Sequence, residues 1–171
     1  MAKIGLFYSF NTTRTLQAAK KIAEELGENI VTHVNVEDTD EHEFMSFKSM
    51  ILGVPTWFDG ELPNYWDEFV PAMEDMDLSG KVIAIFGNAD QKGYPENFAD
   101  AVGIMADLVE GRGGKLTGFT SKEGYSFERS RALRGEHFAG LVLDFENQAD
   151  QIDRRIKDWI KKIKPEMVAG G

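Results

Sequence analysis

Short apolar runs with almost no charge alternate with amphipathic helical patterns along this chain, and this alternation limits the folds open to it. The runs at 49–54, 82–86 and 140–143 are nearly continuous in apolar residues. Such runs are typical of strands covered on both faces, as in a parallel sheet. The run at 3–8 is of the same kind, whereas 29–36 alternates more and is predicted to be an edge strand.

Apolar stripes at helical spacing lie between and after these runs. They consist of Leu16, Ala19, Ala23 and Leu26; Trp66, Phe69, Val70 and Met73; Phe98, Val102, Met105 and Val109; and Ile152, Ile156, Trp159, Ile160 and Ile163. Strand and helix in alternation imply right-handed crossovers and a three-layer α/β sandwich around a five-stranded parallel sheet. We expect one domain over residues 1–167, followed by a frayed tail at 168–171.

Composition excludes several kinds of chemistry. The chain has no cysteine, which rules out disulfides, thiolate nucleophiles and iron–sulfur clusters within it. Its three histidines are far apart and lack the spacing of metal ligands, so no metal site is predicted. No apolar run approaches the length needed to span a membrane, and no secretion signal is visible. The sequence therefore predicts a soluble, cytoplasmic and monomeric protein without membrane insertion.

Charge is distributed unevenly. The formal net charge is −10, and fifteen acidic residues lie between Ile22 and Gly80, where Lys48 is the only Lys or Arg. Cations gather instead in the last helical pattern, at 154–164. Nucleic acid is thereby excluded as a partner, because its phosphates would be repelled. Two interpretations stay open: a solvated face that aids solubility, or steering toward basic protein partners.

The first strand leads into Ser9–Thr15 and then into a helical pattern. A helix start exposes backbone N–H groups that lack an acceptor within the helix, and the helix dipole also favours a bound anion there. The loop adds four hydroxyls, an amide and a guanidinium, which suit a phosphate. Helix capping by the same hydroxyls is the alternative. The strings GxxxxGK[ST] and GxGxxG are both absent, which argues against a P-loop nucleotide triphosphatase and against the dinucleotide-binding fingerprint.

Ligands of such sheets bind beyond the carboxyl ends of the strands. Three loops qualify: 9–15, 55–62 and 87–97. The second carries Trp57 and the third Tyr94, each among turn residues and outside any helical stripe. Two aromatic planes beside a phosphate loop suit a flat, phosphorylated heterocycle, because offset stacking contributes about 0.5–1.5 kcal/mol per ring.

These motifs resemble those of the long-chain flavodoxins over nearly the whole chain. The matching residues are 4–8 with Thr12 and Thr15, 53–57 with 60–62, and Phe86-Gly87, Asp90-Gln91, Gly93-Tyr94 and Asn97-Phe98. The resemblance implies the strand order 2-1-3-4-5, with FMN at the point where the order reverses. It also implies an insertion at 119–137 that splits the fifth strand.

The resemblance further implies the cofactor site. Trp57 and Tyr94 would flank the flavin ring, backbone near Phe58–Asp59 and Asp90 would bond its polar edge, and the first loop would wrap the phosphate. The predicted cofactor-binding residues are Ser9, Phe10, Asn11, Thr12, Thr13, Arg14 and Thr15; Pro55, Thr56, Trp57, Phe58, Asp59 and Gly60; and Gly87, Asn88, Asp90, Tyr94 and Asn97. No catalytic residue is predicted.

The phosphate loop departs from the family pattern T-x-T-G-x-T. Phe10 replaces a hydroxyl, and Thr13 replaces a glycine and must adopt a negative φ or carry strain. Ser9 is the candidate to supply the missing hydroxyl. Arg14 either contacts the phosphate through a charge-assisted bond or points to solvent. Asn88-Ala89 also replaces a Thr-Gly pair in the third loop.

The function that the resemblance implies is a low-potential, one-electron carrier that replaces ferredoxin. Its partners would be basic-surfaced redox proteins: reductases of the ferredoxin/flavodoxin-NADP type, photosystem-type donors or ferredoxin-dependent enzymes. The alternative is an FMN-dependent NAD(P)H quinone or nitro reductase, which needs an open flavin face. A receiver domain is discounted because no Asp ends the third strand, where Gly53-Val54-Pro55 stands. A flavin-less interaction module also stays open.

Overall fold

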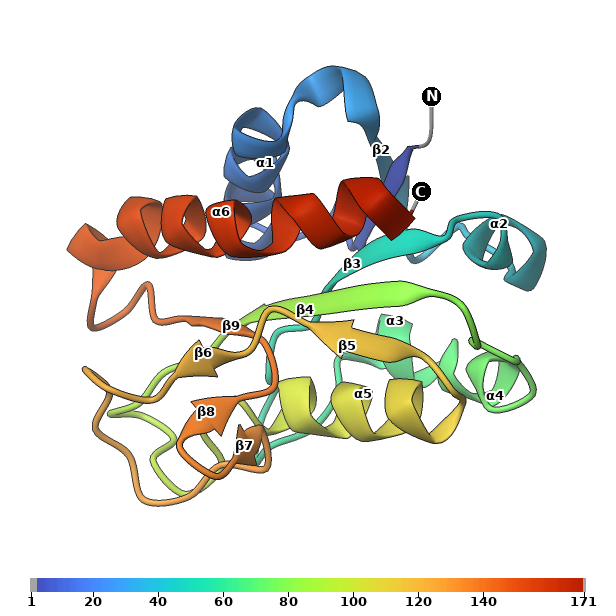
Figure 1. Ribbon diagram of the computed structural model, residues 1–171. Coiled ribbons are helices and arrows are strands. Elements are labelled where there is room, and N and C mark those ends of the chain that lie inside the picture. Colours follow the sequence, from blue (N-terminus) through green and yellow to red (C-terminus); the bar gives the residue numbers. More distant parts are fainter. Residues whose placement is uncertain (1–2, 171) are drawn as a thin grey trace.

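A parallel sheet in the order β2-β1-β3-β4-β5 forms the centre of the protein, as the computed structural model of residues 3–170 shows (Figure 1). Its strands are β1 (Ile4–Tyr8), β2 (Val31–Asn35), β3 (Ser49–Gly53), β4 (Val82–Asn88) and β5 (Lys115–Thr117). The predicted strand order and the edge position of the second strand are therefore confirmed.

The fifth strand is split, as expected. β5 pairs with the first half of β4, from Val82 to Ala84, and β9 (Leu141–Leu143) pairs with the second half, from Phe86 to Asn88. The chain between them forms a small antiparallel sheet in the order β6-β8-β7. Its strands are β6 (Thr120–Ser121), β7 (Leu133–Arg134) and β8 (His137–Phe138). Apolar patterning did not predict β5, because Leu116 is its one apolar residue.

Helices cover both faces of the sheet, which confirms the three-layer architecture (Figure 1). α1 (Arg14–Leu26) and α6 (Ile152–Gly170) lie on one face, and α3 (Asn64–Asp67), α4 (Val70–Met73) and α5 (Asp100–Gly111) lie on the other. Strand side chains alternate between the two cores, so that Leu6 packs with Ile22 and Trp159, whereas Phe7 packs with Trp66. Short 3₁₀ helices, η1 (Glu28–Ile30) and η2 (Ala149–Gln151), complete the connections.

Two helical expectations need correction. The stripe from Trp66 to Met73 forms two four-residue helices instead of one, because Pro71 has no N–H to donate and so interrupts the hydrogen-bond ladder. Phe98 lies before α5 rather than in it, since Ala99 adopts a left-handed conformation with φ +56° at the helix start.

The acidic run at 37–43 forms regular structure. α2 (Glu41–Met45) begins within it, and the helix start is capped by Asp40 Oδ1 accepting from Glu43 N at 2.8 Å. Phe44 anchors this helix in the core.

The tail expected to fray is helical as far as Gly170, and Gly171 lies outside the described residues, as do Met1 and Ala2. Buried Met167 holds the end of α6, and its carbonyl accepts a bond of 2.6 Å from the buried Ser49 hydroxyl. Within residues 3–170, no helix combines the length and the apolar character that a membrane crossing requires.

Candidate functional site: the carboxyl edge of the sheet

The start of α1 has no side-chain cap. Thr13 occupies the N-cap position with φ −97° and makes no capping hydrogen bond, so the negative φ that the sequence required is adopted. Capping by Thr13 therefore does not explain the hydroxyls of this loop. The first-turn amides of the helix have no acceptor inside it, and they remain available to an anion together with the helix dipole.

Three of the four loop hydroxyls already donate within the protein. Thr12 Oγ1 donates to the Ser9 carbonyl at 2.8 Å, and Thr15 Oγ1 donates to Asn88 Oδ1 at 2.9 Å. The buried Ser9 hydroxyl donates to Glu37 Oε2 and accepts from Asn11 N at 3.2 Å. Ser9 thus shapes the loop from inside and does not present the hydroxyl that Phe10 lacks.

Phe10 and Arg14 both point outward. The Phe10 ring, 41% exposed, lies 5.1 Å from the ring of Tyr8, and the Phe10 amide donates to Asn35 Oδ1 at 3.3 Å. The Arg14 guanidinium lies 5.3 Å from the centre of the Phe145 ring and reaches Gln17 Oε1 at 3.5 Å. The exposed Arg14 side chain therefore contacts α1 and Phe145 and no other residue of its own loop within the described part of the chain.

The second loop is closed by a pair of backbone bonds between Trp57 and Glu61, of 2.8 and 2.7 Å. Trp57 is half-buried, with its ring edge-on to Tyr65 at 5.7 Å, whereas the Phe58 side chain is 68% exposed. Phe58 has φ +48°, a region that costs a non-glycine residue about 1 kcal/mol or more. Gly60 has φ +92°, and a Cβ there would lie 2.6 Å from Asp100 Oδ2, so glycine is required.

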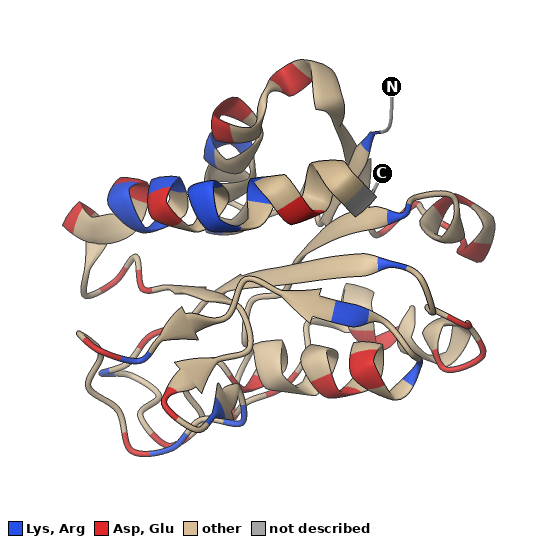
Figure 2. Ribbon diagram, viewed as in Figure 1, with Lys and Arg blue, Asp and Glu red and all other residues tan. Residues whose placement is uncertain are grey.

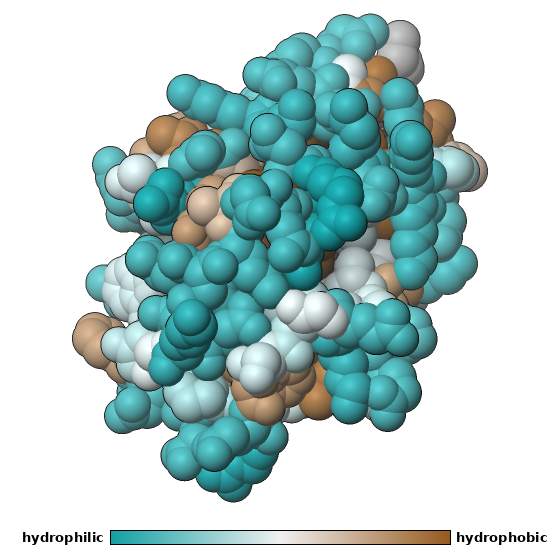
Figure 3. All heavy atoms as spheres, turned by 90° about the vertical axis from the view of Figure 1, so that its left-hand side faces the viewer, coloured by the Kyte–Doolittle hydropathy of each residue, from teal (hydrophilic) through white to brown (hydrophobic). Residues whose placement is uncertain are grey.

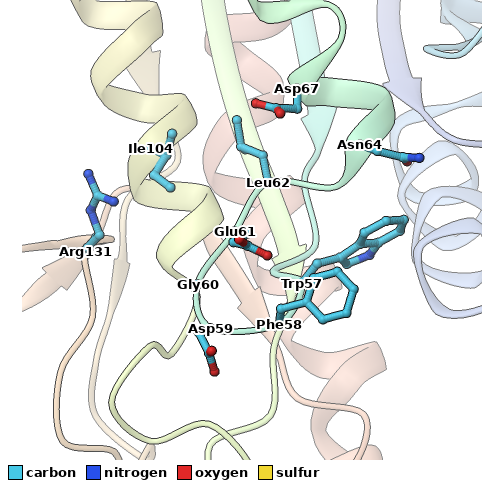
Figure 4. A pocket seen from close by; sticks show the side chains of 10 residues that line it. All are labelled: Trp57, Phe58, Asp59, Gly60, Glu61, Leu62, Asn64, Asp67, Ile104 and Arg131. Atoms are coloured by element: carbon cyan, nitrogen blue, oxygen red, sulfur yellow. The ribbon is translucent and has the colours of Figure 1, made fainter.

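A pocket of about 750 Å³ lies beside this loop, bounded by Ile104 of α5 and by Arg131 of the insertion (Figure 4). In this view the rings of Trp57 and Phe58 point away from Ile104 and Arg131. Trp57 and Phe58 line the end of the pocket away from Ile104 and Arg131, so the pocket runs along the whole of this loop.

The third loop is built on Asp90. Its carboxylate accepts from Lys92 N at 3.1 Å, Gly93 N at 2.8 Å and Asn147 Nδ2 at 2.8 Å. Burial acts to raise the pKa of Asp90, but these hydrogen bonds outweigh it and the pKa is lowered. Tyr94 N donates to the Asp90 carbonyl at 3.0 Å, so the backbone of Tyr94 is fixed. The Tyr94 ring itself is 47% exposed.

Two further residues of this loop set its geometry. Asn97 N donates to the Tyr94 carbonyl at 3.3 Å and so completes the turn. Gly87 lies at the end of β4, where a Cβ would be 2.2 Å from the Val54 carbonyl oxygen. Only glycine allows β3 and β4 to end this close together.

Asn88 ties the three loops together. Its side chain accepts from Thr15 of the first loop, and its carbonyl accepts from Thr56 N of the second at 3.3 Å. Thr56 Oγ1 in turn accepts from Ala101 N at 3.1 Å and so caps the start of α5. Pro55, the residue before it, is buried. The predicted residues of all three loops therefore meet at one edge of the sheet.

Each loop presents one exposed aromatic ring. Among residues 3–170, the exposed large hydrophobic side chains are Phe10, Phe58, Tyr94 and Val168, and the first three belong to the three loops. Figure 3, which views the side where the insertion lies and α6 begins, shows a largely hydrophilic face with small, separate apolar groups.

Sequence reasoning missed four residues that support the site: Glu37, Gln91, Asp144 and Asn147. Fully buried Asp144 accepts from Gln91 Nε2 at 2.7 Å and from Asn147 N at 3.0 Å, and Gln91 Oε1 accepts from Ser126 N at 2.6 Å. This network joins the third loop to the insertion. Two signals were available: the Asp90-Gln91 motif, and Asp144 directly after an apolar strand at the edge where ligands bind.

Comparison with known proteins gives a consistent result. The flavodoxin family model matches residues 6–159. A flavodoxin of Nostoc sp. is 42% identical over 164 residues, covering 96% of each chain, and flavodoxin 1 of Escherichia coli is 35% identical over 168 residues, covering 98% of this chain and 96% of its own. The crystal structure of a Fusobacterium nucleatum flavodoxin bound to flavin mononucleotide has a TM-score of 0.92 at 34% identity, covering 98% of this chain and 99% of its own.

The fold and the edge site define a doubly wound α/β flavoprotein of the electron-transfer class. The chain belongs to the flavodoxin family. Flavodoxins are electron carriers and not enzymes that turn over a substrate of their own.

Proposed function

We propose that this flavodoxin binds FMN non-covalently at the carboxyl edge of the sheet and carries single electrons between redox proteins. The observation that carries the site assignment is the uncapped start of α1 behind the Ser9–Thr15 loop. A phosphate bound there would accept hydrogen bonds from the free first-turn amides. The helix dipole would stabilise its negative charge without the help of a cation. Arg14 lies over the Phe145 ring, so the proposed phosphate site does not depend on its charge.

The aromatic rings of the other two loops would hold the flavin ring. Tyr94 is exposed, and among residues 3–170 only its backbone forms hydrogen bonds, so its ring is free to stack on one face. Trp57 is fixed edge-on by Tyr65 and would form the other wall, with exposed Phe58 at its margin. The backbone of Phe58–Asp59 and Asp90 would meet the polar edge of the ring.

When bound, the flavin supplies the redox chemistry, and the protein tunes it by binding the redox states unequally. The acidic residues between 22 and 80 disfavour a reduced, negatively charged flavin, which supports a low potential and the role of a ferredoxin substitute.

The same charges support basic-surfaced redox partners of the ferredoxin/flavodoxin-NADP reductase type, photosystem-type donors or ferredoxin-dependent enzymes. Figure 2 shows Lys and Arg concentrated on α6, whereas acids follow α2 and the loops near it. A steered, short-lived complex suits a monomer in the cytoplasm, which is the state we propose.

Stopped-flow reduction by a ferredoxin-NADP reductase tests this function. The FMN-loaded protein should be reduced by NADPH only when the reductase is present, and the rate should fall as salt is added, because screening weakens the steering. NADPH oxidation by the isolated protein would contradict the carrier function and favour a reductase. A rate independent of salt would contradict the proposed partner surface alone.

A further inference from the structure

A carboxylate lies on the phosphate loop. Glu37, in the turn after β2, accepts from the Ser9 hydroxyl and from Asn11 Nδ2 at 3.1 Å, and both bonds end on the same oxygen, Oε2. The turn is also tied to the loop through Asn35, whose Oδ1 accepts from Phe10 N at 3.3 Å and from Glu37 N at 3.2 Å. Glu37 thus takes two donors from the loop that is proposed to wrap a phosphate.

The charge on this carboxylate has no counter-ion. In the described part of the chain Glu37 forms no salt bridge, and Asp38, Asp40, Glu41 and Glu43 follow it in sequence. Arg14, the one cation of the loop, is directed toward Phe145 instead. The Glu37 charge also reaches α3, because the pKa of Tyr65 is raised by burial and further by this carboxylate.

We propose that Glu37 is an internal competitor of the flavin phosphate and sets the affinity of the protein for it. The inference rests on the proposed FMN site. The carboxylate occupies the Ser9 and Asn11 donors and repels a phosphate dianion bound to the neighbouring amides. The repulsion acts on the phosphate, so a flavin that lacks it does not experience the competition.

The variant Glu37→Gln isolates the charge. The single oxygen Oε1 of Gln can accept both bonds that now end on Oε2, so the loop keeps its shape while the charge is lost. Dissociation constants of FMN and of riboflavin, measured by flavin fluorescence quenching at low salt, give the readout. We expect Glu37→Gln to bind FMN about 3- to 10-fold more tightly and to leave riboflavin affinity unchanged.

Glu24→Gln is the matched control. Glu24 is an exposed acid on α1, so it changes the net charge by the same amount away from the loop, and FMN affinity should change by less than about twofold. Unchanged or weaker FMN binding by Glu37→Gln, or an equal change for FMN and riboflavin, would overturn the proposed competition. Wild-type protein that binds neither flavin would contradict the proposed function instead.

Discussion

Thr15 Oγ1 donates a hydrogen bond of 2.9 Å to Asn88 Oδ1, joining two loops that are 73 residues apart in sequence. Thr15 is buried, and Asn88 also accepts from Thr56 of the second loop. The contact therefore holds the start of α1, and the amides it exposes, against the end of β4.

Thr15→Val should separate the phosphate loop from β4. Valine preserves the shape but leaves the Asn88 acceptor without its donor, which costs about 1 kcal/mol or more in a buried site. Urea unfolding of the flavin-free protein should show this loss, and FMN affinity should fall as well. Thr15→Ser, which keeps the hydroxyl, is the control and should recover most of the affinity. Equal affinity in the valine variant and wild type would count against the junction.

Tyr94→Ala should weaken FMN binding without unfolding the protein. The ring is 47% exposed and its loop is held by Asp90, so flavin-free stability should change little. Loss of stacking should raise the FMN dissociation constant at least about threefold. Tyr94→Phe retains the ring and should bind like wild type in the same fluorescence titration. An alanine variant with wild-type affinity would remove Tyr94 from the flavin site.

Asp59→Gly should make the one-electron-reduced state easier to reach. The Phe58–Asp59 peptide is our candidate for the backbone that turns toward the reduced flavin, and it has no glycine at either position. A glycine lowers the cost of that rotation by about 1 kcal/mol, so the first reduction potential should rise by about 40 mV. Asp59→Asn removes the same charge without adding backbone flexibility. Its shift in the first reduction potential therefore measures the part of the effect that comes from the charge alone. Equal shifts in both variants would exclude the backbone explanation.

Asp144→Asn should destabilise the third loop. The fully buried carboxylate accepts from Gln91 and Asn147, and an amide in its place turns one acceptor into a donor that faces other donors. The unfolding free energy should fall by about 2–4 kcal/mol. Asp150→Asn, at an exposed position in η2, should leave stability within about 0.5 kcal/mol in the same urea titration. Wild-type stability of Asp144→Asn would show that the network contributes little.

Tyr125 should make the protein less stable at alkaline pH. Burial raises the pKa of its phenol to about 12, an effect that Arg155 opposes and the Asp144 charge reinforces. The phenol ionises near pH 10 when unfolded, so its contribution is complete below that pH and is lost as pH rises toward 12. The loss amounts to at most about 2–3 kcal/mol.

Tyr125→Phe tests this dependence. The variant loses the bond from the Tyr125 hydroxyl to the Val142 carbonyl at every pH, but its unfolding free energy should fall less steeply than that of wild type above pH 10. Parallel curves for the two proteins would contradict the assignment to Tyr125.

The sequence predicted the sheet well because its strands are buried on both faces, and continuous apolar runs carry that information directly. The predictions were wrong where single residues or individual hydrogen bonds determine the secondary structure. One proline divides the stripe at 66–73 into α3 and α4, and β5 is too short and polar to be seen as a strand. The tail to Gly170 is held in helix by the buried Met167 and by Ser49, a contact that no local pattern reveals.

In the candidate site, too, some features were predictable from the sequence and others were not. Loop positions follow from topology, so 9–15, 55–62 and 87–97 were identifiable as a set. The direction of each hydroxyl was not, because Ser9 and Thr15 bond to residues 28 and 73 positions away. Glu37 looked like one member of an acidic run, and only the fold brings its carboxylate to Ser9 and Asn11.

A spectroelectrochemical titration of the FMN-loaded protein shows whether the flavin passes single electrons. We expect two separate one-electron steps, the second at the lower potential, with a distinct long-wavelength absorbance between them. A single two-electron step without that absorbance would rule out a one-electron carrier and favour an enzyme of hydride transfer.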